Sequence, residues 1–304
     1  MGRLHYGTRG SSLSIAQTEI VARKIEQAYP EIKCELVKIK TLNEKIDRNV
    51  EKATDKDIYT KEIDAALSEG SIDIAVHSLK DLKNELNKGI VLACVPERDS
   101  PFDCIIKGRG FESKSRPIIG TSSIRRRVQV PGIVKNAVVK DIHGNVDTRL
   151  KALDGGSIDA LILAEAGIRR LGYNIELTEL GADMMIPAVG QGALAITARA
   201  NDSKIIKMME GIGDKKAEAE TFAERAFGRV FGIGCDMPIG ALALADEKRM
   251  QIKIIGFLSD IEGKKQIRKS IEGSLNNPEG LGRELGKQVM EDGGEDIIAG
   301  NIKG

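Results

Sequence analysis

The sequence predicts an α/β fold in which two related, doubly wound domains flank a cleft and a small α+β third domain follows. Strand-like and helix-like segments alternate along most of the 304 residues, which is typical of parallel sheets covered by helices. A Gly-Thr pair after a strand-like segment occurs at Gly7 and again at Gly120, and a Gly-Ser-Ile-Asp block occurs at 70–73 and again at 156–159. The chain is also longer than the roughly 250 residues at which a single core stops growing.

Both halves show the same order of elements. In the first half we expect a strand, a helix, a strand, a charged loop, a helix and two strands at 4–6, 13–28, 32–40, 41–57, 58–69, 71–77 and 90–95. In the second half we expect a strand, a helical stretch and then a strand, a helix and a strand, with the bounded segments at 118–119, 137–142, 146–154 and 157–162. The two landmarks recur after 113 and 86 residues, and the difference of 27 residues is an insertion that could include the charged loop.

The last third of the chain predicts how the domains are divided. Residues 193–199 resemble a strand that returns after the second half, so the first domain is expected to be discontinuous. A helix at about 215–230 precedes three strand-like runs and a final helix, which fit a small α+β domain, at 240–246, 250–258, 264–271 and 277–292. The predicted domains are 1–97 with 193–212, then 98–192, and then 213–304.

The composition excludes several classes of protein. Lysine and arginine number 46 against 45 acidic residues, whereas a general nucleic-acid or membrane-surface binder carries a large basic surplus. The longest apolar run, Ile90–Val95, is far shorter than the roughly 20 residues that span a bilayer. Three dispersed histidines and four scattered cysteines without a CxxC pair predict neither a metal site nor a disulfide framework. The first residues lack a signal-peptide core, so we expect a soluble, reduced, cytoplasmic protein.

Both Gly-Thr turns carry polar side chains where a strand passes into a helix. The free N–H groups of a helix N-terminus favour an anion, and arginine binds carboxylates through two parallel hydrogen bonds. The residues concerned are Arg9, Ser11, Ser122, Ser123, Arg125 and Arg126. Serine capping beside a solvated basic face is the competing interpretation, which the recurrence in both halves makes less favoured. Neither turn has a nucleotide-binding GxxxxGK[ST] or GxGxxG pattern, so a carboxylate is at least as suitable a ligand as a phosphate.

Further candidates follow other predicted strands. Lys80 and Asp81 come after the strand at 71–77, at the end where parallel sheets hold ligands. A Schiff-base pair, a general acid–base pair and a surface ion pair all remain open for these two residues. More polar residues follow the strands of the second half, namely His143, Arg149, Arg169 and Arg170. His5 and His77 lie within strand-like segments and are interpreted as core residues.

Cys235 differs from the other cysteines in its surroundings. It lies in the loop 232–240, which has three glycines and a proline, so its thiol is not expected on a regular packed face. Flanking glycines let a bulky group approach closely. The other three cysteines lie in or beside apolar runs and are interpreted as buried small hydrophobes. Cys235 is therefore a candidate functional thiol, with an inert loop cysteine as the alternative.

Together these motifs resemble the porphobilinogen deaminase (hydroxymethylbilane synthase) family. The matches follow the order of the family's motifs and cover about residues 4–245. The most specific are the His-Ser-x-Lys-Asp block at 77–81 and the Gly-Thr-Ser-Ser-x-Arg-Arg block at 120–126. The other segments that carry the resemblance are 7–11, 144–150, 166–172, 187–192, 223–226 and 234–240.

The resemblance implies a transferase that deaminates four porphobilinogen molecules and joins them head to tail into linear hydroxymethylbilane, with release of ammonia, in tetrapyrrole biosynthesis. It implies two periplasmic-binding-protein-like domains and a third domain that carries the cofactor loop. The implied cofactor is a dipyrromethane, attached by a thioether at the position of Cys235. The family expectation is a monomer whose partner is porphobilinogen, with neither nucleic acid nor membrane.

The resemblance also implies roles for single residues. By motif position, Asp81 is the carboxylate that stabilises the positively charged pyrrole intermediates. The residues that would hold the cofactor are Cys235, Lys80, Asp81, Ser123, Arg125, Arg126 and Arg149. The residues that would bind substrate and the growing chain are Arg9, Ser11, Gln17, His143, Arg149 and Arg170. The chemistry agrees, because each pyrrole brings two carboxylates for arginines to bind and loss of ammonia leaves a cation for one carboxylate to stabilise.

A few positions depart from the family pattern. His143 stands where an arginine usually precedes Gly-Asn, and histidine is a less constant donor near neutral pH. The other departures lie in the presumed lid at 41–59, where Thr41–Glu44 replaces a threonine–basic–glycine–aspartate sequence, Thr54–Asp57 replaces a glycine-rich stretch, and Tyr59 replaces a phenylalanine.

Two functions of other classes stay open on the residues alone. A two-lobed binding protein for a small anion would explain the two halves and their helix N-termini. It would not explain the Lys80–Asp81 pair or the glycine-flanked thiol of Cys235. A Schiff-base transferase with a pyridoxal-type cofactor would use Lys80 as the covalent residue.

Overall fold

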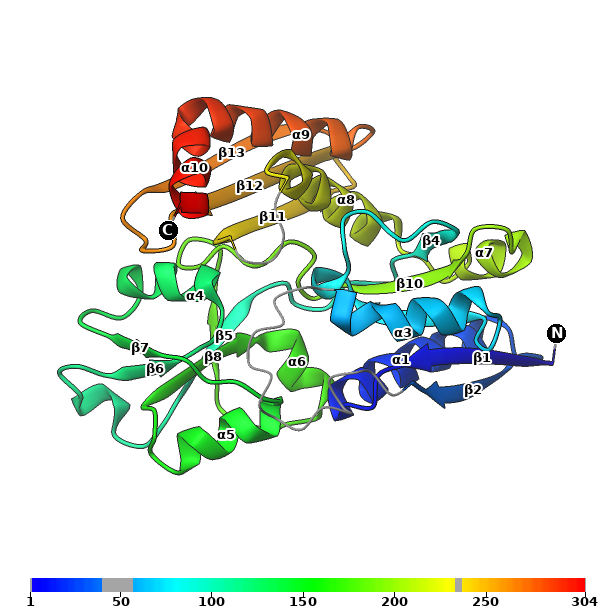
Figure 1. Ribbon diagram of the computed structural model, residues 1–304, viewed down its shortest axis with the longest axis horizontal. Coiled ribbons are helices and arrows are strands. Elements are labelled where there is room, and N and C mark those ends of the chain that lie inside the picture. Colours follow the sequence, from blue (N-terminus) through cyan, green and yellow to red (C-terminus); the bar gives the residue numbers. More distant parts are fainter. Residues whose placement is uncertain (1, 40–56, 233–236, 304) are drawn as a thin grey trace. The chain divides into compact units, whose positions relative to one another are not determined.

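The computed structural model describes residues 2–39, 57–232 and 237–303 (Figure 1). The chain divides into two compact units, one made of Met1–Asp99 with Ala193–Glu218 and one made of Ser100–Gly192 with Ala219–Gly304. The described residues form two five-stranded sheets and one three-stranded sheet. None of their helices is long and apolar enough to cross a membrane. The second unit holds two of the sheets, and the three-domain boundaries given above stay a prediction.

The sheet of the first unit has the order β2-β1-β3-β10-β4. Strands β1, β2, β3 and β4 run in one direction, and β10 runs antiparallel to both of its neighbours. The bounds are β1 Arg3–Thr8, β2 Lys33–Lys38, β3 Ile74–Ser78, β4 Ile90–Cys94, β10 Leu194–Arg199, α1 Ser12–Ala28, α3 Asp57–Ser68, η1 Leu79–Asp81 and α7 Ser203–Glu210. The returning strand expected at 193–199 is β10, and it lies between β3 and the edge strand β4.

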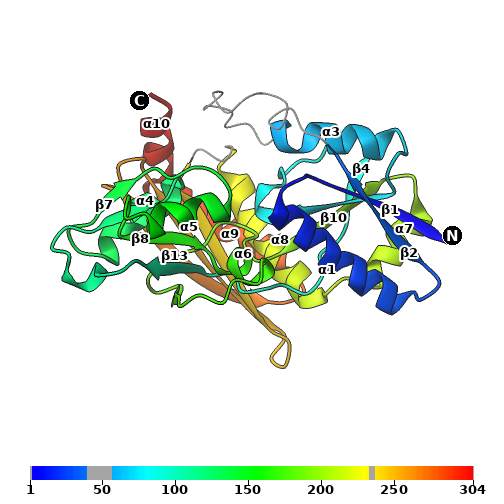
Figure 2. The same cartoon turned by 90° about the horizontal axis from the view of Figure 1, so that it is seen from below.

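The residues of β3 alternate between the two faces of this sheet, as the strand period requires. Ile74 and Val76 join a core cluster with residues of α1 and α7, whereas Ala75 joins a cluster with Ile63 and Leu67 of α3. Helices α1 and α3 therefore cover opposite faces of the sheet, as Figure 2 shows. Both faces are buried, so β3 has no polar residue before His77.

The larger sheet of the second unit has the order β7-β6-β8-β5-β9, which repeats the topology of the first. Again four strands run one way, and β5 is antiparallel to β8 and β9. The bounds are β5 Asp103–Lys107, β6 Ile118–Gly120, β7 Val138–Lys140, β8 Ala160–Ala164, β9 Thr178–Leu180, η2 Phe111–Ser113, α4 Ile124–Gln129, η3 Val130–Gly132, α5 Val146–Asp154 and α6 Glu165–Arg170. The predicted doubly wound α/β pair with mostly parallel sheets is confirmed.

The repeated sequence landmarks perform the same task in both halves. A Cβ atom on Gly7 would collide with Cδ1 of Ile72, and a Cβ atom on Gly120 would collide with Cδ1 of Ile158, so the matching isoleucines pack directly against both glycines. The aspartates of the two Gly-Ser-Ile-Asp blocks also match. Asp73 Oδ2 accepts a 2.8 Å hydrogen bond from the His5 amide, and Asp159 Oδ2 accepts one of 2.8 Å from the Ile118 amide. The repeat is therefore structural as well as sequential.

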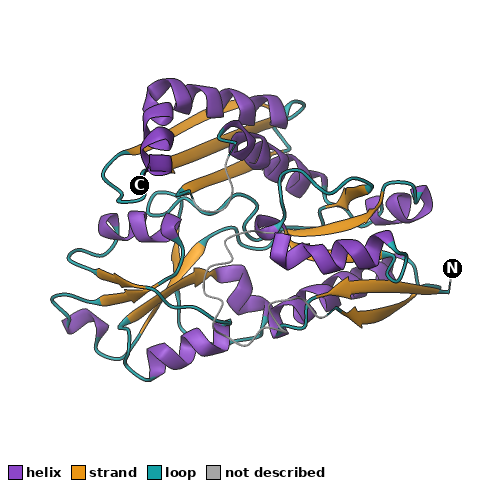
Figure 3. Cartoon of the chain, in the orientation of Figure 1, coloured by secondary structure: helices purple, strands orange, loops and turns teal. Residues whose placement is uncertain are grey.

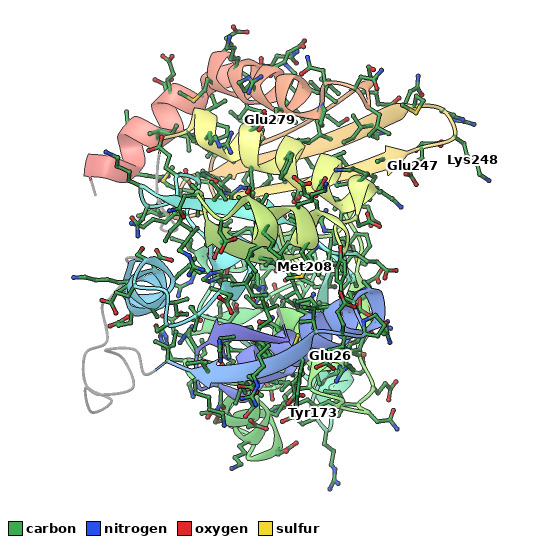
Figure 4. The ribbon with its side chains drawn as sticks, turned by 90° about the vertical axis from the view of Figure 1, so that its right-hand side faces the viewer. Glu26, Tyr173, Met208, Glu247, Lys248 and Glu279 are labelled. Carbon is green, nitrogen blue, oxygen red and sulfur yellow. The ribbon has the colours of Figure 1, made fainter. Side chains whose placement is uncertain are left out.

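The third sheet is antiparallel, in the order β11-β12-β13. The bounds are β11 Ile239–Asp246, β12 Gln251–Ser259, β13 Gln266–Ser274, α8 Lys215–Val230, α9 Pro278–Val289, η4 Met290–Gly294 and α10 Glu295–Lys303. Apolar residues of α8 and α9 share one core cluster with β11 and β12, and Figure 3 shows these helices against the strands. Figure 4 labels Glu247 and Lys248 at the turn between β11 and β12, and Glu279 in the first turn of α9. The predicted small α+β arrangement is confirmed.

Candidate functional site

The first group of candidate residues follows β3. Leu79, which is 1% exposed, anchors the turn η1, and its amide donates a 3.0 Å hydrogen bond to the carbonyl of Ala193, the residue before β10. The Leu82 amide closes the turn with a 3.1 Å bond to the Leu79 carbonyl. Asp81 ends this turn with an exposed side chain, and no described residue donates to its carboxylate. The fold therefore presents a fixed carboxylate that is available to an external cation.

Gln17 connects α1 to the end of the same strand. Its side chain is buried, its Nε2 donates to Ser78 Oγ at 2.9 Å, and the Ser78 hydroxyl lies 3.2 Å from Gln17 Oε1. Lys80 is half-buried in the adjoining turn. The structure thus brings Gln17, Lys80 and Asp81 to one end of β3, as the sequence predicts for Lys80 and Asp81.

Arg9 and Ser11 lie at the first Gly-Thr turn. Ser11 is the N-cap of α1, where its Oγ accepts from the Ser14 amide at 3.2 Å and donates to Ser14 Oγ at 2.8 Å. The structure therefore confirms that Ser11 caps a helix, which was the competing interpretation of this serine. Arg9 is half-buried.

His77 precedes this group and is buried within β3. Its Nε2 lies 3.1 Å from Thr197 Oγ1 on β10, and burial lowers the pKa of His77 from 6.5 to about 4. The imidazole is therefore neutral at pH 7, which agrees with the interpretation of His77 as a core residue.

This shift predicts an acid-sensitive fold. Because the folded-state pKa lies below the unfolded value, protonation favours the unfolded chain, and the stabilisation present above pH 6.5 is lost as the pH falls toward 4. We expect the free energy of unfolding to fall by up to about 3 kcal/mol over that window through His77 alone. Urea melts of the wild type and of His77→Gln at several pH values isolate the contribution of His77 to the free energy of unfolding, because both proteins share all the other titratable groups. A wild-type–variant difference that does not change with pH would contradict the assignment.

The second group surrounds Asp103 at the start of β5. Arg125 and Arg126 on α4 are only 4% and 6% exposed, and Asp103 is 0% exposed. Arg125 Nη1 lies 2.9 Å from Asp103 Oδ2, and Arg126 Nε donates to Asp103 Oδ1 at 2.8 Å. Burial lowers the pKa of Arg125, and the Asp103 charge opposes that shift. One carboxylate therefore holds two neighbouring guanidinium groups.

Ser123 and Arg149 lie near these arginines. Ser123 stands at the N-cap position of α4, yet its side chain makes no capping hydrogen bond. Arg149 on α5 donates from Nε to the Gly144 carbonyl at 2.9 Å. Burial and the positive charge of Arg126 both lower the pKa of Arg149. His143 is exposed, and no described residue forms a hydrogen bond with its ring.

The two consecutive arginines of α6 have different surroundings. Arg169 Nε donates to Glu165 Oε1 at 2.9 Å, and the Ser100 hydroxyl also donates to this buried glutamate. Arg170 donates from Nη2 to the Gly192 carbonyl. The sequence did not identify Glu165, whose signal is only a carboxylate four residues before an arginine on a helix.

Asp103 is the other site residue that sequence reasoning missed. The available signal was a single aspartate beside the apolar residues Cys104–Ile106. The arginines that pair with Asp103 lie on α4, more than twenty residues further along the chain, so the spacing in the sequence does not reveal the pairing. Cys235 lies outside the described residues. Among the described residues, no group of His, Cys, Asp or Glu could hold a metal ion.

Comparisons with known proteins identify what the chain is similar to. Residues 4–207 match the family model "Porphobilinogen deaminase, dipyromethane cofactor binding domain", and residues 218–291 match "Porphobilinogen deaminase, C-terminal domain". The probable porphobilinogen deaminase of Nitrosopumilus maritimus is 41% identical over 294 residues, covering 96% of this chain and 94% of the relative. The porphobilinogen deaminases of Roseiflexus castenholzii and Thermus thermophilus are 37% and 39% identical, covering 98% and 96% of this chain and 99% and 97% of the relatives.

Proposed function

The chain belongs to the porphobilinogen deaminase family, and from that premise we propose which of its residues carry each part of the reaction. It is a transferase that deaminates porphobilinogen and joins four molecules into linear hydroxymethylbilane for tetrapyrrole biosynthesis. Residues 4–207 match the family model of the domain that binds the dipyrromethane cofactor. The observation that carries the function is this pair of family matches, which together span most of the chain.

The residues around Asp103 fit a dipyrromethane, whose two rings each bear an acetate and a propionate. Arg125, Arg126 and Arg149 bring three positive charges against the single carboxylate of Asp103, so the cluster has an excess of positive charge. Ser123 has a hydroxyl that α4 does not use for capping. We propose that these arginines and Ser123 hold the cofactor's carboxylates, with Lys80 as a further cation. When bound, the dipyrromethane supplies the primer to which pyrrole units are added.

Cys235 is proposed as the residue that bears the thioether. This proposal rests on its position in the family motif at 234–240, since the residue lies outside the described part of the chain. The described cysteines favour no alternative: burial raises the pKa of the Cys94 and Cys104 thiols to about 12, which disfavours the reactive thiolate.

Asp81 is proposed as the catalytic carboxylate. Departure of ammonia from porphobilinogen leaves a positive charge on the pyrrole, whereas the intact ring is neutral. A carboxylate therefore stabilises the charged state more than the ground state, which lowers the barrier. Asp81 suits this task because its side chain is exposed at the end of a well-anchored turn and no described donor occupies it.

The acetate and propionate groups of substrate are proposed to be bound by Arg9, Arg149 and Arg170, with His143 as a further substrate-binding residue. We propose that Ser11 and Gln17 also bind substrate and the growing chain, in addition to the hydrogen bonds that their side chains make to Ser14 and Ser78. We propose further that the chain acts as a cytoplasmic monomer without nucleic acid, which the family expectation and the net charge of +1 support.

The experiment that tests this function combines the intact mass of the purified protein with an assay of porphobilinogen consumption. We expect the mass to exceed that of the chain by one dipyrromethane, a colour reaction with Ehrlich's reagent, and release of ammonia. An unmodified mass together with no turnover would refute the function. In that case an aldimine absorbance band would support the Schiff-base transferase, and binding of porphobilinogen without turnover would support the two-lobed binding protein.

The arginine-rich site predicts salt-sensitive substrate capture despite the near-neutral total charge. Raising the ionic strength from 0.01 to 0.15 M shortens the Debye length from about 30 to about 8 Å, which screens the attraction between arginines and carboxylates. We expect KM for porphobilinogen to rise several-fold over this range, with kcat less affected. Sucrose at matched osmolality is the control. A KM that stays constant with salt would contradict electrostatic capture.

A further inference from the structure

The carboxylate of Asp103 is completely buried and lies between the side chains of two arginines. Its Oδ1 is 2.8 Å from both Nε and Nη2 of Arg126, and its Oδ2 is 2.9 Å from Nη1 of Arg125. The side-chain amide of Gln191 also contacts this carboxylate, because its Nε2 donates a hydrogen bond to Asp103 Oδ1 at 3.1 Å. Asp103 therefore fixes two guanidinium groups at once, and its own position is fixed by an amide.

A charged group at this place needs an explanation beyond packing. Asp103 stands on β5 opposite Ala164 of β8 and Leu180 of β9, in a sheet against which two apolar core clusters pack. Burial of charged groups is costly even when they are paired, and apolar residues of similar volume often stabilise a fold as well or better. The arrangement also places two positive charges side by side, and the single carboxylate reduces their repulsion.

The contacts of each guanidinium group are confined to part of its donors. A guanidinium has five N–H groups. Nη1 of Arg125 donates to the Ile186 carbonyl at 2.6 Å and lies 2.9 Å from Asp103 Oδ2. Nε and Nη2 of Arg125 have no acceptor among the described residues. On Arg126, Nε and Nη2 face Asp103 while Nη1 donates to the Ile162 carbonyl at 3.1 Å. Each group is thus held in a set plane with donor capacity left over.

We infer that Asp103 is a positioning residue that pre-orients Arg125 and Arg126 for the pyrrole carboxylates, an inference that rests on the function proposed above. Long arginine side chains lose rotamer freedom when they bind a ligand, and a carboxylate that already holds them reduces this loss. Small errors in the orientation of bound groups are costly to reaction rate. Asp103 touches neither substrate nor reacting atoms in this role; it acts through the two arginines.

The test compares wild type, Asp103→Asn and the matched control Asp159→Asn. Asparagine keeps the shape of aspartate but has one acceptor oxygen, so it cannot hold both guanidinium groups. Asp159, the residue before β8, has a carboxylate that accepts from the Ile118 amide and pairs with Lys114 instead of the two arginines. We measure the thermal melt, the fraction carrying the dipyrromethane mass, the kcat and KM of that fraction, and solvent exchange of the Arg126 Nε–H by NMR.

We expect Asp103→Asn to melt cooperatively, to lose protection of the Arg126 Nε–H, and to show kcat lowered about 10- to 100-fold in the cofactor-bearing fraction. The control should match wild type in kcat, in KM and in protection of Arg126. A lowered melting temperature with unchanged kcat and unchanged Nε–H protection would overturn the inference, because it would show a purely structural role. If wild type itself carries no dipyrromethane and consumes no porphobilinogen, the proposed function fails instead.

A second variant covers the case in which Asp103→Asn does not fold. Gln191→Leu keeps the Asp103 charge and removes the amide that donates to Asp103 Oδ1 at 3.1 Å and to the Pro101 carbonyl at 2.9 Å. We expect a smaller loss of kcat in the same direction, with faster exchange of the Arg126 Nε–H. Wild-type kcat together with wild-type exchange in this variant would overturn the inference.

Discussion

Asp81→Asn should abolish turnover of porphobilinogen and leave the fold intact. The side chain is exposed and no described residue donates to it, so its loss removes no internal hydrogen bond or ion pair of the described chain. Asparagine has nearly the same shape but cannot stabilise a developing positive charge. We expect kcat to fall by at least about 10²–10³-fold, the range found when one preorganised electrostatic contact to a transition state is removed.

The measurement is single-turnover release of ammonia, with the thermal melt recorded on the same sample. Glu85→Gln is the matched control, because Glu85 is another exposed carboxylate that follows the same turn. We expect the control to keep wild-type turnover and both variants to keep the wild-type melting temperature. Full activity of Asp81→Asn would remove Asp81 from its assigned role.

Cys235→Ser should give a chain that carries no dipyrromethane and makes no hydroxymethylbilane. A serine hydroxyl is a much poorer nucleophile than a thiolate, so the covalent bond to the cofactor should not form. The intact mass should equal that of the unmodified chain, and porphobilinogen consumption should fall to background.

Cys34→Ser is the control for that variant. The Cys34 thiol is half-buried, and burial together with the charge of Glu26 raises its pKa to about 11, so it is almost entirely protonated at neutral pH. We expect this variant to keep the cofactor mass and full turnover. A dipyrromethane mass retained by Cys235→Ser would show that another residue bears the cofactor.

Much of the fold followed from local patterns in the sequence. The helices at 146–154 and 215–230 were predicted with the bounds of α5 and α8, because their apolar periodicity, caps and flanking glycines are local signals. Strands β5 and β9 were not predicted. Residues 178–180 form only a short strand, and β5 pairs with β8, more than fifty residues further along the chain. Such pairing depends on contacts that no local window contains.

The residues of the candidate site likewise fall into those with a local sequence signal and those whose role depends on distant contacts. Lys80, Asp81, Arg125 and Arg126 were identified because they follow strands in recognisable motifs, and the structure places them at those strand ends. Asp103 was missed because its importance comes from arginines on a later helix. The turn at Ser11 shows the opposite case, since a residue expected to bind substrate also caps its own helix.

The place of β10 in the first sheet has a consequence for synthesis on the ribosome. β4 is connected to that sheet only through β10, and β10 consists of Leu194–Arg199. The first 99 residues therefore emerge without the strand that joins β3 to β4, and each of these two strands is left with an unpaired edge. An exposed edge of this kind is a template for wrong pairing. The whole of residues 100–192 must leave the ribosome before the N-terminal sheet can close, so the first sheet to begin is completed only after every strand of the second five-stranded sheet has been made.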